Sequence, residues 1–413
     1  MYDELGRLSD KRLHASNYDG ASAITVNSTF NYLQSLDYTY NIRGWMTAIN
    51  DVSTCATQSG DQVADLFKLQ LSYDAPAGGG TAQYNGNIST MQWRTYIGTT
   101  CLAQQQYRFS YDAANRLTAA DHYTNSSGSW TFTNNYTESN ITYDLNGNLK
   151  TYTRRGLTSG TSTFGVIDNL TYAYSATIPD RLIAMTDAGN ITRGFKYKNS
   201  IIGDHYLYDA NGNLTQDKHK DLAIAYNHLN LPHAINNLAD EYILLTYTAD
   251  GEKLTKLAGG VTKNYVAGIE YAGANLEAIY HAEGRCVLIS DTFRYEYTLK
   301  DHLGNARVNW RANGTAVTFL EELHYYPFGM LMEGIGTAAV TVNAYKYNSK
   351  ELNTDLGLNW SDYGARWYDA SVGRWWSVDP LAEKYVGWSP YNYGINNPII
   401  FIDPLGMEII NSH

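Results

Sequence analysis

The sequence has few prolines, few cysteines and no long apolar run. Eight prolines and three cysteines are spread over 413 residues. The cysteines are odd in number and lack a C-x-x-C spacing, so they favour buried free thiols over a disulfide framework or a zinc site; they are Cys55, Cys101 and Cys286. No stretch approaches the roughly eighteen apolar residues of a membrane-spanning helix. We therefore expect no membrane span and no metal, and the N-terminus shows no signal peptide.

Positive charge is also scarce. The chain has thirty Lys and Arg residues and 41 Asp and Glu residues, which gives a net charge of −11. Such a chain repels phosphate backbones, which excludes nucleic acid as the main partner. The usual catalytic signatures are missing as well: no G-x-S-x-G elbow occurs, and the glycines near Gly334 lack the βαβ context of a dinucleotide site. We predict no cofactor.

Tyrosine and glycine are abundant instead. The chain holds 36 Tyr against 10 Phe and 9 Trp, together with 35 Gly. Tyrosine favours strands, where the ring is buried and the hydroxyl keeps a polar partner. Glycine favours tight turns. The composition therefore predicts an all-β protein built from many short strands.

A short pattern recurs along the chain. Compare Phe109–Leu117, Ile141–Leu149 and Tyr206–Leu214: each has a strand-like start, a Tyr-Asp pair, a turn and a closing Leu. Six of the tyrosines follow one another at intervals of 31 to 38 residues, namely Tyr40, Tyr73, Tyr111, Tyr143, Tyr174 and Tyr208. Regular spacing of this length is typical of stacked supersecondary units. We predict a repeat of antiparallel hairpins.

Each copy can be explained physically. Alternation in Ile141-Thr142-Tyr143 places every second side chain on one face of a strand. Asp144 can accept hydrogen bonds from the amides of the turn. Asn146-Gly147 predicts a two-residue hairpin turn with positive φ angles. For the same reason, replacing Gly212 by Val is expected to damage its hairpin.

The pattern changes near residue 320. The later stretches are rich in aromatic residues and in Asp-Pro and Asn-Pro pairs; they are Tyr345–Glu351, Gly357–Asp369, Gly373–Lys384, Trp388–Pro398 and Phe401–Gly406. Over residues 345–407 the order of these motifs resembles the core domain associated with Rhs repeats, in the form seen in Bacteroidetes-like bacteria. The hairpin units before it resemble tyrosine-aspartate (YD) repeats.

The resemblance implies a fold and a division of the chain. It implies a curled β-spiral, a partial cocoon made of YD-repeat hairpins, with an inward-directed C-terminal plug. We expect a shell at residues 1–320, a core or plug domain at 321–407 and a short remnant at 408–413. It further implies that the chain is the shell and plug of a polymorphic toxin that encapsulates a polypeptide effector.

The resemblance also implies self-cleavage by aspartic-protease-like chemistry. We expect at most this one enzymatic activity from the chain. Carried over to this sequence, the two carboxylates are Asp379 and Asp403, and the cut follows Met407. Arg374 is an auxiliary candidate that orients a carboxylate or pairs with it structurally. Two departures from the family pattern are Ala382 in place of Gly and a 24-residue separation of the aspartates. The alternative is that each Asp-Pro pair simply begins a turn.

Partners and location follow from the same resemblance. We expect an encapsulated toxin polypeptide or a neighbouring shell protein as partner, a secretion apparatus as a further one, and a secreted or cell-surface location. A second interpretation is an extracellular adhesion module that binds carbohydrate or protein, which aromatic patches on the outer face would favour. A third is a truncated remnant without cargo, because the chain opens in mid-repeat and ends six residues after the expected cut.

Overall fold

The structure is a computed structural model that describes residues 1–15, 32–55, 64–98, 100–126, 128–190, 192–336 and 343–412. Regular structure in these ranges is almost all β-strand, and the helical elements there are four short 3₁₀ segments. None of the helices among these residues is long and apolar enough to cross a membrane. The predicted all-β, antiparallel fold class is confirmed.

The first sheet has 13 strands joined mainly as consecutive antiparallel hairpins. Two short strands lie off this path: β6 pairs with β5, and β9 pairs with β8. The strands are β1 (Asp10–Ala15), β2 (Tyr32–Tyr40), β3 (Met46–Ile49), β4 (Phe67–Ser72), β5 (Thr90–Ile97), β6 (Thr100–Cys101), β7 (Gln104–Tyr111), β8 (Leu117–Asn125), β9 (Trp130–Phe132), β10 (Glu138–Tyr143), β11 (Leu149–Ser159), β12 (Thr163–Tyr174) and β13 (Leu182–Asp187).

The second sheet also has 13 strands, each paired with the next in sequence. This order is what a chain of short hairpins produces. The strands are β14 (Tyr206–Tyr208), β15 (Leu214–Asp217), β16 (Leu222–Tyr226), β17 (Pro232–Asn237), β18 (Tyr242–Tyr247), β19 (Lys253–Ala258), β20 (Val261–Val266), β21 (Ile269–Ala272), β22 (Asn275–His281), β23 (Gly284–Ile289), β24 (Thr292–Lys300), β25 (Ala306–Asn313) and β26 (Ala316–Glu322).

Residues 343–412, called the C-terminal segment below, form short elements. A four-stranded sheet, β27 to β30, is followed by a two-stranded sheet, β31 and β32. The elements are η1 (Tyr347–Ser349), β27 (Glu351–Asn353), η2 (Asp355–Gly357), β28 (Trp360–Asp362), β29 (Trp367–Asp369), β30 (Arg374–Trp375), η3 (Ala382–Tyr385), η4 (Gly394–Asn396), β31 (Phe401–Ile402) and β32 (Ile410–Asn411). The expected domain divisions at residues 320 and 407 stay a prediction.

The hairpin turns are held by the aspartate of the Tyr-Asp pair. Asp144 Oδ1 accepts the backbone N–H groups of Asn146 at 2.9 Å and Asn148 at 2.8 Å. The two-residue turn expected at Asn146-Gly147 is wrong, because the Asp144 N–H donates to Asn148 O at 2.9 Å and closes a three-residue loop. Only one left-handed residue is then needed, and Gly147 supplies it with φ +80°.

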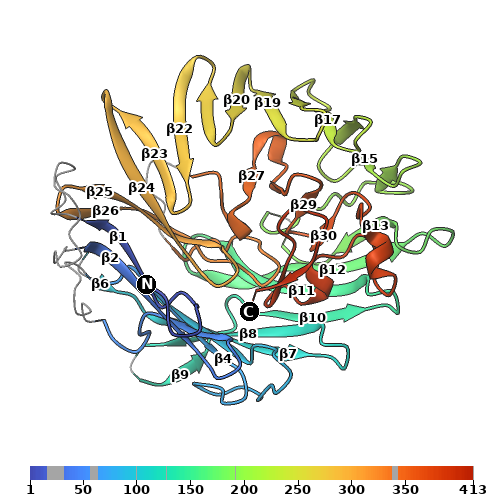
Figure 1. Cartoon of the computed structure of the whole chain (residues 1–413). Coiled ribbons are helices and arrows are strands. Elements are labelled where there is room, and N and C mark those ends of the chain that lie inside the picture. The colour runs from blue at the N-terminus through green and yellow to red at the C-terminus, as the bar shows by residue number, and fades with distance from the viewer. Residues whose placement is uncertain are drawn as a thin grey trace.

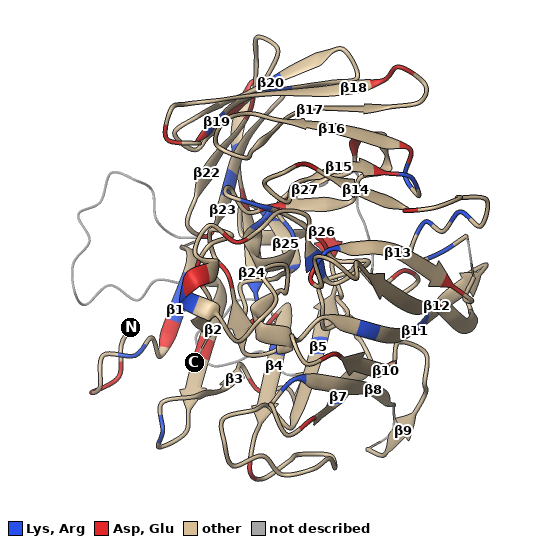
Figure 2. Ribbon diagram, turned by 90° about the vertical axis from the view of Figure 1, so that its right-hand side faces the viewer, with Lys and Arg blue, Asp and Glu red and all other residues tan. Residues whose placement is uncertain are grey.

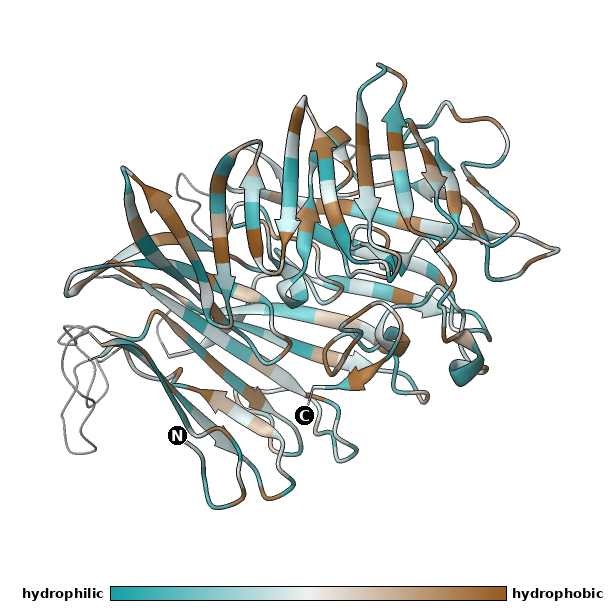
Figure 3. Cartoon of the chain, turned by 45° about the horizontal axis from the view of Figure 1, so that its top comes forward, coloured by the Kyte–Doolittle hydropathy of each residue, from teal (hydrophilic) through white to brown (hydrophobic). Residues whose placement is uncertain are grey.

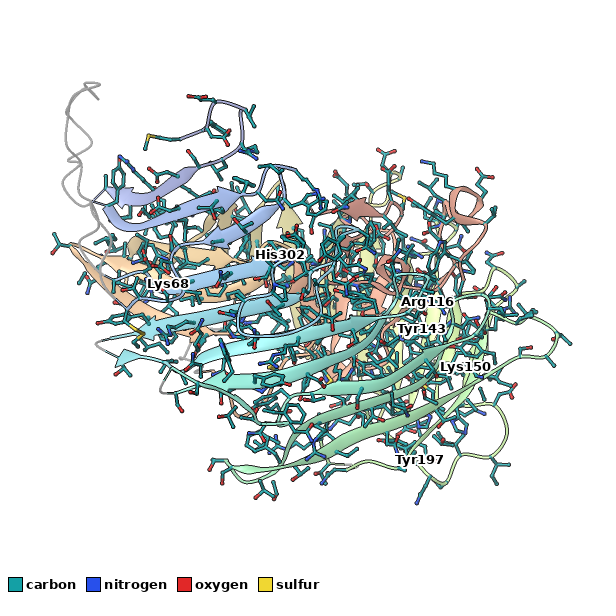
Figure 4. The ribbon with its side chains drawn as sticks, turned by 90° about the horizontal axis from the view of Figure 1, so that it is seen from below. Lys68, Arg116, Tyr143, Lys150, Tyr197 and His302 are labelled. Carbon is teal, nitrogen blue, oxygen red and sulfur yellow. A yellow bond between two sulfur atoms is a disulfide. The ribbon has the colours of Figure 1, made fainter. Side chains whose placement is uncertain are left out.

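The tyrosine of each unit ties it to an earlier one. The hydroxyls donate to backbone carbonyls: Tyr111 to Ile88 at 2.7 Å, Tyr143 to Leu117 at 2.6 Å. Figure 4 shows Arg116 beside Tyr143, and the Arg116 guanidinium lies 4.6 Å from the centre of that ring. These contacts explain why tyrosine, rather than phenylalanine, dominates the chain: the ring is covered while the hydroxyl keeps a partner.

The two sheets curl around the C-terminal segment, with the first sheet below it and the second above it in Figure 1. Hydrophobic and hydrophilic residues alternate along many of the strands, as Figure 3 shows. One core cluster contains residues of the first sheet (Trp93), the second sheet (Trp310) and the C-terminal segment (Trp360 and Trp376). The C-terminal segment therefore serves as the shared core of both sheets.

The cysteines depart in part from the expectation of free thiols. Cys55 and Cys101 form a disulfide, with their Cα atoms 5.9 Å apart. Their 46-residue separation hides this proximity, because the intervening strands fold the segment after β3 back beside β6. Cys286 is a buried free thiol, as predicted.

Candidate functional site

Three stretches of the C-terminal segment meet around one buried arginine. Arg366 immediately precedes β29, and its backbone carbonyl accepts the N–H of Tyr363 at 3.0 Å. The Trp375 ring of β30 lies under the Arg366 guanidinium, 4.3 Å from the carbon at its centre. Asp379 lies just before η3, and Asp403 follows β31 directly. Short turns therefore bring distant parts of the sequence together here.

Both predicted aspartates bind the same nitrogen. Arg366 Nη2 donates to Asp379 Oδ2 at 2.9 Å and to Asp403 Oδ2 at 2.8 Å. All three side chains are buried; Asp403 is 1% exposed and Asp379 7%. Two ionised carboxylates beside one guanidinium would leave a buried net negative charge, which is costly. The arrangement therefore favours the protonated form of Asp379.

The surroundings of Asp379 also favour its protonated form. Burial raises the pKa of Asp379, the Arg366 guanidinium opposes that rise, and the nearby Asp403 adds to it. The Asp379 Oδ1 atom also accepts the Leu381 N–H at 2.7 Å, which is the turn-forming bond expected of an Asp-Pro pair. Turn formation and carboxylate pairing thus coexist at this residue.

The expected cleavage position lies against Asp403. Asp403 Oδ1 accepts the backbone N–H of Met407 at 2.8 Å and that of Glu408 at 3.1 Å. Arg366 Nε donates to the Gly406 carbonyl oxygen at 2.6 Å. Peptide bonds on both sides of Met407 are therefore within reach of the Arg366–Asp403 pair.

Arg374, the auxiliary candidate, lies elsewhere. It donates to the Tyr174 hydroxyl at 3.2 Å and to the Asp180 carbonyl at 3.0 Å. Its guanidinium also packs on the Tyr391 ring at 4.8 Å. These contacts join β30 to the first sheet, and the carboxylate contacts expected of Arg374 are made by Arg366.

Sequence reasoning overlooked Arg366. The signal was present, because Arg366 is a charged residue inside an aromatic run, Tyr363 to Tyr368, where a cation requires a buried partner. Nothing in its sequence position names the partner, since the aspartates follow 13 and 37 residues later. Among the residues that the structure describes, no group of three or more His, Cys, Asp or Glu side chains is placed to hold a metal ion.

Sequence comparison finds partial relatives. No family model matches the chain. Salivary gland surface protein 1 of Aedes aegypti is 32% identical over 113 residues, which is 27% of this chain and 3% of that protein. Toxin subunit YenC1 of Yersinia entomophaga is 31% identical over 147 residues, which is 33% of this chain and 14% of the toxin subunit. The chain thus spans a small fraction of either relative.

Structural comparison covers nearly the whole chain. The crystal structure of TcdB2-TccC3-Cdc42 matches 98% of this chain, with a TM-score of 0.59 and 16% sequence identity. The match covers 20% of that solved chain. At this identity the likeness concerns the fold, and it places the two curled sheets and the C-terminal segment together in one known β architecture.

Proposed function

We propose that the chain is part of the shell and plug of an Rhs-type toxin, and that it helps to encapsulate a polypeptide effector. The observation that carries the proposal is the position of the C-terminal segment, on the concave side of both sheets (Figure 1). The likeness to TcdB2-TccC3 and the partial match to toxin subunit YenC1 support it. Function as a shell needs no turnover of an external substrate.

Contacts from both sheets hold the C-terminal segment in place. From the first sheet, the Tyr172 hydroxyl donates to the Val372 carbonyl at 3.0 Å. From the second sheet, Lys253 Nζ donates to Asp362 Oδ2 at 2.6 Å. Each contact is buried or largely buried, so removing one partner would leave an unpaired polar group. A plug that closes one end of a shell requires attachment of this kind.

The pocket beside the C-terminal segment is too small for a polypeptide guest. It has a volume of about 240 Å³ and lies between loops of the sheets, the segment after β26 and the C-terminal segment, lined in part by Lys196, Glu333 and Tyr347. Pockets for single small molecules are typically about 300–1,000 Å³. A polypeptide guest therefore needs further wall, which a neighbouring shell protein or additional repeats would supply. The Cys55–Cys101 disulfide supports a secreted or cell-surface location, where disulfides persist.

Encapsulation is tested by the protection of an attached peptide. An unstructured, protease-sensitive peptide is joined after His413 in one protein and before Met1 in another. Both proteins are assembled with the neighbouring shell protein and then treated with trypsin. Encapsulation predicts that the C-terminal peptide survives and the N-terminal peptide is lost. Equal digestion of the two peptides would overturn the proposal.

We also propose self-cleavage by Asp379 and Asp403. In this mechanism the Asp403 carboxylate takes a proton from a water molecule, which attacks the peptide carbonyl carbon, while the protonated Asp379 carboxyl polarises the carbonyl oxygen. The C–N bond then breaks, and Asp403, beside the amide nitrogens, returns the proton to the leaving amine. The cut after Met407 is the first candidate. The Gly406–Met407 bond is the second, because Arg366 holds its carbonyl oxygen.

Intact mass spectrometry tests the cleavage and identifies the bond. The parent chain is expected to lose residues 408–413, or 407–413 for the alternative bond. The Asp403→Asn and Asp379→Asn variants are expected to keep their full mass, and Asp180→Asn, outside the site, is expected to be processed as the parent is. Full-length mass in the parent, measured on folded protein, would exclude cleavage and leave encapsulation to its own test.

One feature favours adhesion as a second candidate function. Phe293 and Tyr295 of β24 are 53% and 51% exposed, and Leu288 on the paired strand β23 is 42% exposed. Exposed aromatic side chains of this kind bind sugar rings or protein surfaces. Binding to immobilised glycans that is lost in Phe293→Ser/Tyr295→Ser would support adhesion, and equal binding by parent and variant would exclude this surface.

A further inference from the structure

The turn between β15 and β16, residues 217–221, is called the junction turn here because it meets two other parts of the molecule. Asp217 Oδ1 accepts the backbone N–H of His219 at 2.9 Å and of Lys220 at 3.2 Å, which fixes the shape of the turn. With the backbone held in this way, the side chains of His219 and Lys220 leave the turn in defined positions.

On one side the junction turn binds the crossover between the two sheets, which runs from β13 to His205. His219 Nδ1 accepts the Lys198 N–H at 3.1 Å, and the other ring nitrogen, Nε2, lies 2.9 Å from His205 Nδ1. Lys198 also forms an ion pair with Asp221. The crossover is therefore fastened at its middle and at its end.

On the other side the junction turn binds the C-terminal segment. Lys220 Nζ donates to Asp369 Oδ2 at 2.7 Å and to the Leu358 carbonyl at 2.6 Å. The Lys220 and Asp369 side chains are buried, so this contact is not replaced readily by water. Neighbouring residues of one turn thus hold the seam between the sheets and the plug.

The hydrogen bonds require both histidines to be neutral. His205 Nδ1 also accepts the Met185 N–H at 3.2 Å, so this nitrogen carries no proton. His219 Nδ1 accepts from Lys198, so His219 Nε2 carries the proton that is donated to His205. A proton added to either ring would place two N–H donors opposite each other, and the hydrogen bond at that nitrogen would be lost.

Charges around the pair also disfavour protonation. Lys198 of the crossover and Lys220 of the junction turn face His219, while Lys218 and Asp204 lie near His205 and act in opposite directions. Burial, with the His205 ring and these lysines, lowers the pKa of His219 to about 3. Burial also lowers the pKa of His205. When the turn opens, both rings return toward the ordinary pKa of about 6.5.

We propose that the junction turn is an acid-sensitive latch, in which protonation of the His205–His219 pair releases the crossover and with it the Lys220 attachment of the C-terminal segment. Acid then favours the open form, because the open form binds protons that the closed form excludes. One histidine with an ordinary pKa in the open form increases opening by about 30-fold between pH 7.5 and 5.0. The latch does not depend on the proposed encapsulation.

Hydrogen exchange read by mass spectrometry tests the latch. Peptides over 196–206 and 217–222 are compared at pH 7.5 and 5.0, after correction for the intrinsic pH dependence of exchange. Opening of these peptides is expected to rise by about 30-fold and to remain faster than the opening of peptides over β4 at both pH values. No rise, or opening that is no faster than that of β4, would overturn the proposal, since the second result means unfolding of the whole molecule.

The matched variants replace only the titrating groups. In His205→Asn/His219→Asn the side-chain oxygens can accept the same backbone N–H groups but do not titrate, so the acid-induced opening is expected to disappear. His233→Asn, an exposed histidine on β17, is expected to behave as the parent does. Should the double variant not fold at pH 7.5, each single variant is measured, and retention of the full rise in both would overturn the latch.

Discussion

Buried charges in this molecule are shared among several partners. Arg154 lies between Glu138 and Asp168 in the first sheet, as Arg366 lies between two aspartates in the C-terminal segment. A guanidinium suits this role because it presents several donors in one plane. Removing such a cation leaves two buried carboxylates without their counter-ion, which is strongly destabilising.

Arg366→Met is therefore expected to destabilise the fold by about 3–5 kcal/mol, the usual cost of breaking a buried ion pair. The free energy of unfolding in urea measures the loss. Lys384→Met is the control: its pair with Glu408 is 53% and 63% exposed, and such pairs contribute about 0–1 kcal/mol. Equal effects of the two changes would show that the Arg366 site is open to water.

Gly212 is a second sensitive position. Its φ is +87°, and a Cβ atom there would lie 2.6 Å from Tyr391 Oη and 2.7 Å from Val378 Cγ2. Gly212→Ala is expected to cost about 2 kcal/mol more than Gly203→Ala, because only the first substitution adds overpacking to backbone strain. Gly203 has φ +74° and open space around it. Matching urea midpoints for the two variants would count against docking of the C-terminal segment on this hairpin.

His122 predicts acid sensitivity within the first sheet. Burial lowers the pKa of His122 to about 3, whereas the unfolded value is about 6.5. The unfolded chain therefore binds a proton first as the pH falls, so stability is complete above pH 6.5 and declines toward pH 3. His122→Phe should remove about 2 kcal/mol of the loss seen at pH 5. Urea unfolding at pH 7.5 and 5.0 measures it, and an unchanged loss would refute the assignment.

At the level of strands and hairpins, the repeated unit is held by polar groups at defined positions. The aspartate closes the turn, and the tyrosine hydroxyl reaches the backbone of an earlier unit. Asp301 makes the same kind of contact much later in the chain, where its Oδ1 accepts the N–H of Leu303 at 3.0 Å. The units therefore share one local design even where their sequences have diverged.

Tyr143→Phe tests that design. The change keeps the ring and removes the hydrogen bond to the Leu117 carbonyl, so a cost of about 1 kcal/mol is expected. Tyr84→Phe is the control, since Tyr84 is 71% exposed. Thermal and urea unfolding would report the difference, and a neutral Tyr143→Phe would mean that the hydroxyl does not link the units.

Local sequence patterns predicted the strands and hairpins well, but they did not predict contacts between residues that are distant in sequence. Alternation and the Tyr-Asp pairs were enough to predict antiparallel hairpins, because each depends on neighbours in sequence. The turn at Asn146-Gly147 was predicted one residue too short, because the Asp144 side chain closes a wider loop than the dipeptide alone favours. Arg366 and the Cys55–Cys101 pair were missed because their partners lie 13 to 46 residues away in sequence, and only the fold brings them together.

At the level of the whole molecule, contacts between oppositely charged side chains join the three parts. Figure 2 shows Lys and Arg positions beside Asp and Glu positions along the strands that surround the C-terminal segment. Lys11 of β1 pairs with Glu283, which joins the first sheet to the second. Lys256 of β19 pairs with Asp355, which joins the second sheet to the C-terminal segment. These two contacts are what a curled wall with an inward C-terminal segment requires.

Zero-length carbodiimide cross-linking, read by mass spectrometry, tests this arrangement most directly. The Lys11–Glu283 and Lys256–Asp355 atom pairs lie 2.9 and 3.1 Å apart, and each pair is partly exposed, so both links are expected to form. The Lys198–Asp221 pair, which joins the crossover to the junction turn and involves neither the first sheet nor the C-terminal segment, serves as the positive control. Formation of the control link with neither long-range link would contradict a wall curled around its own C-terminal segment.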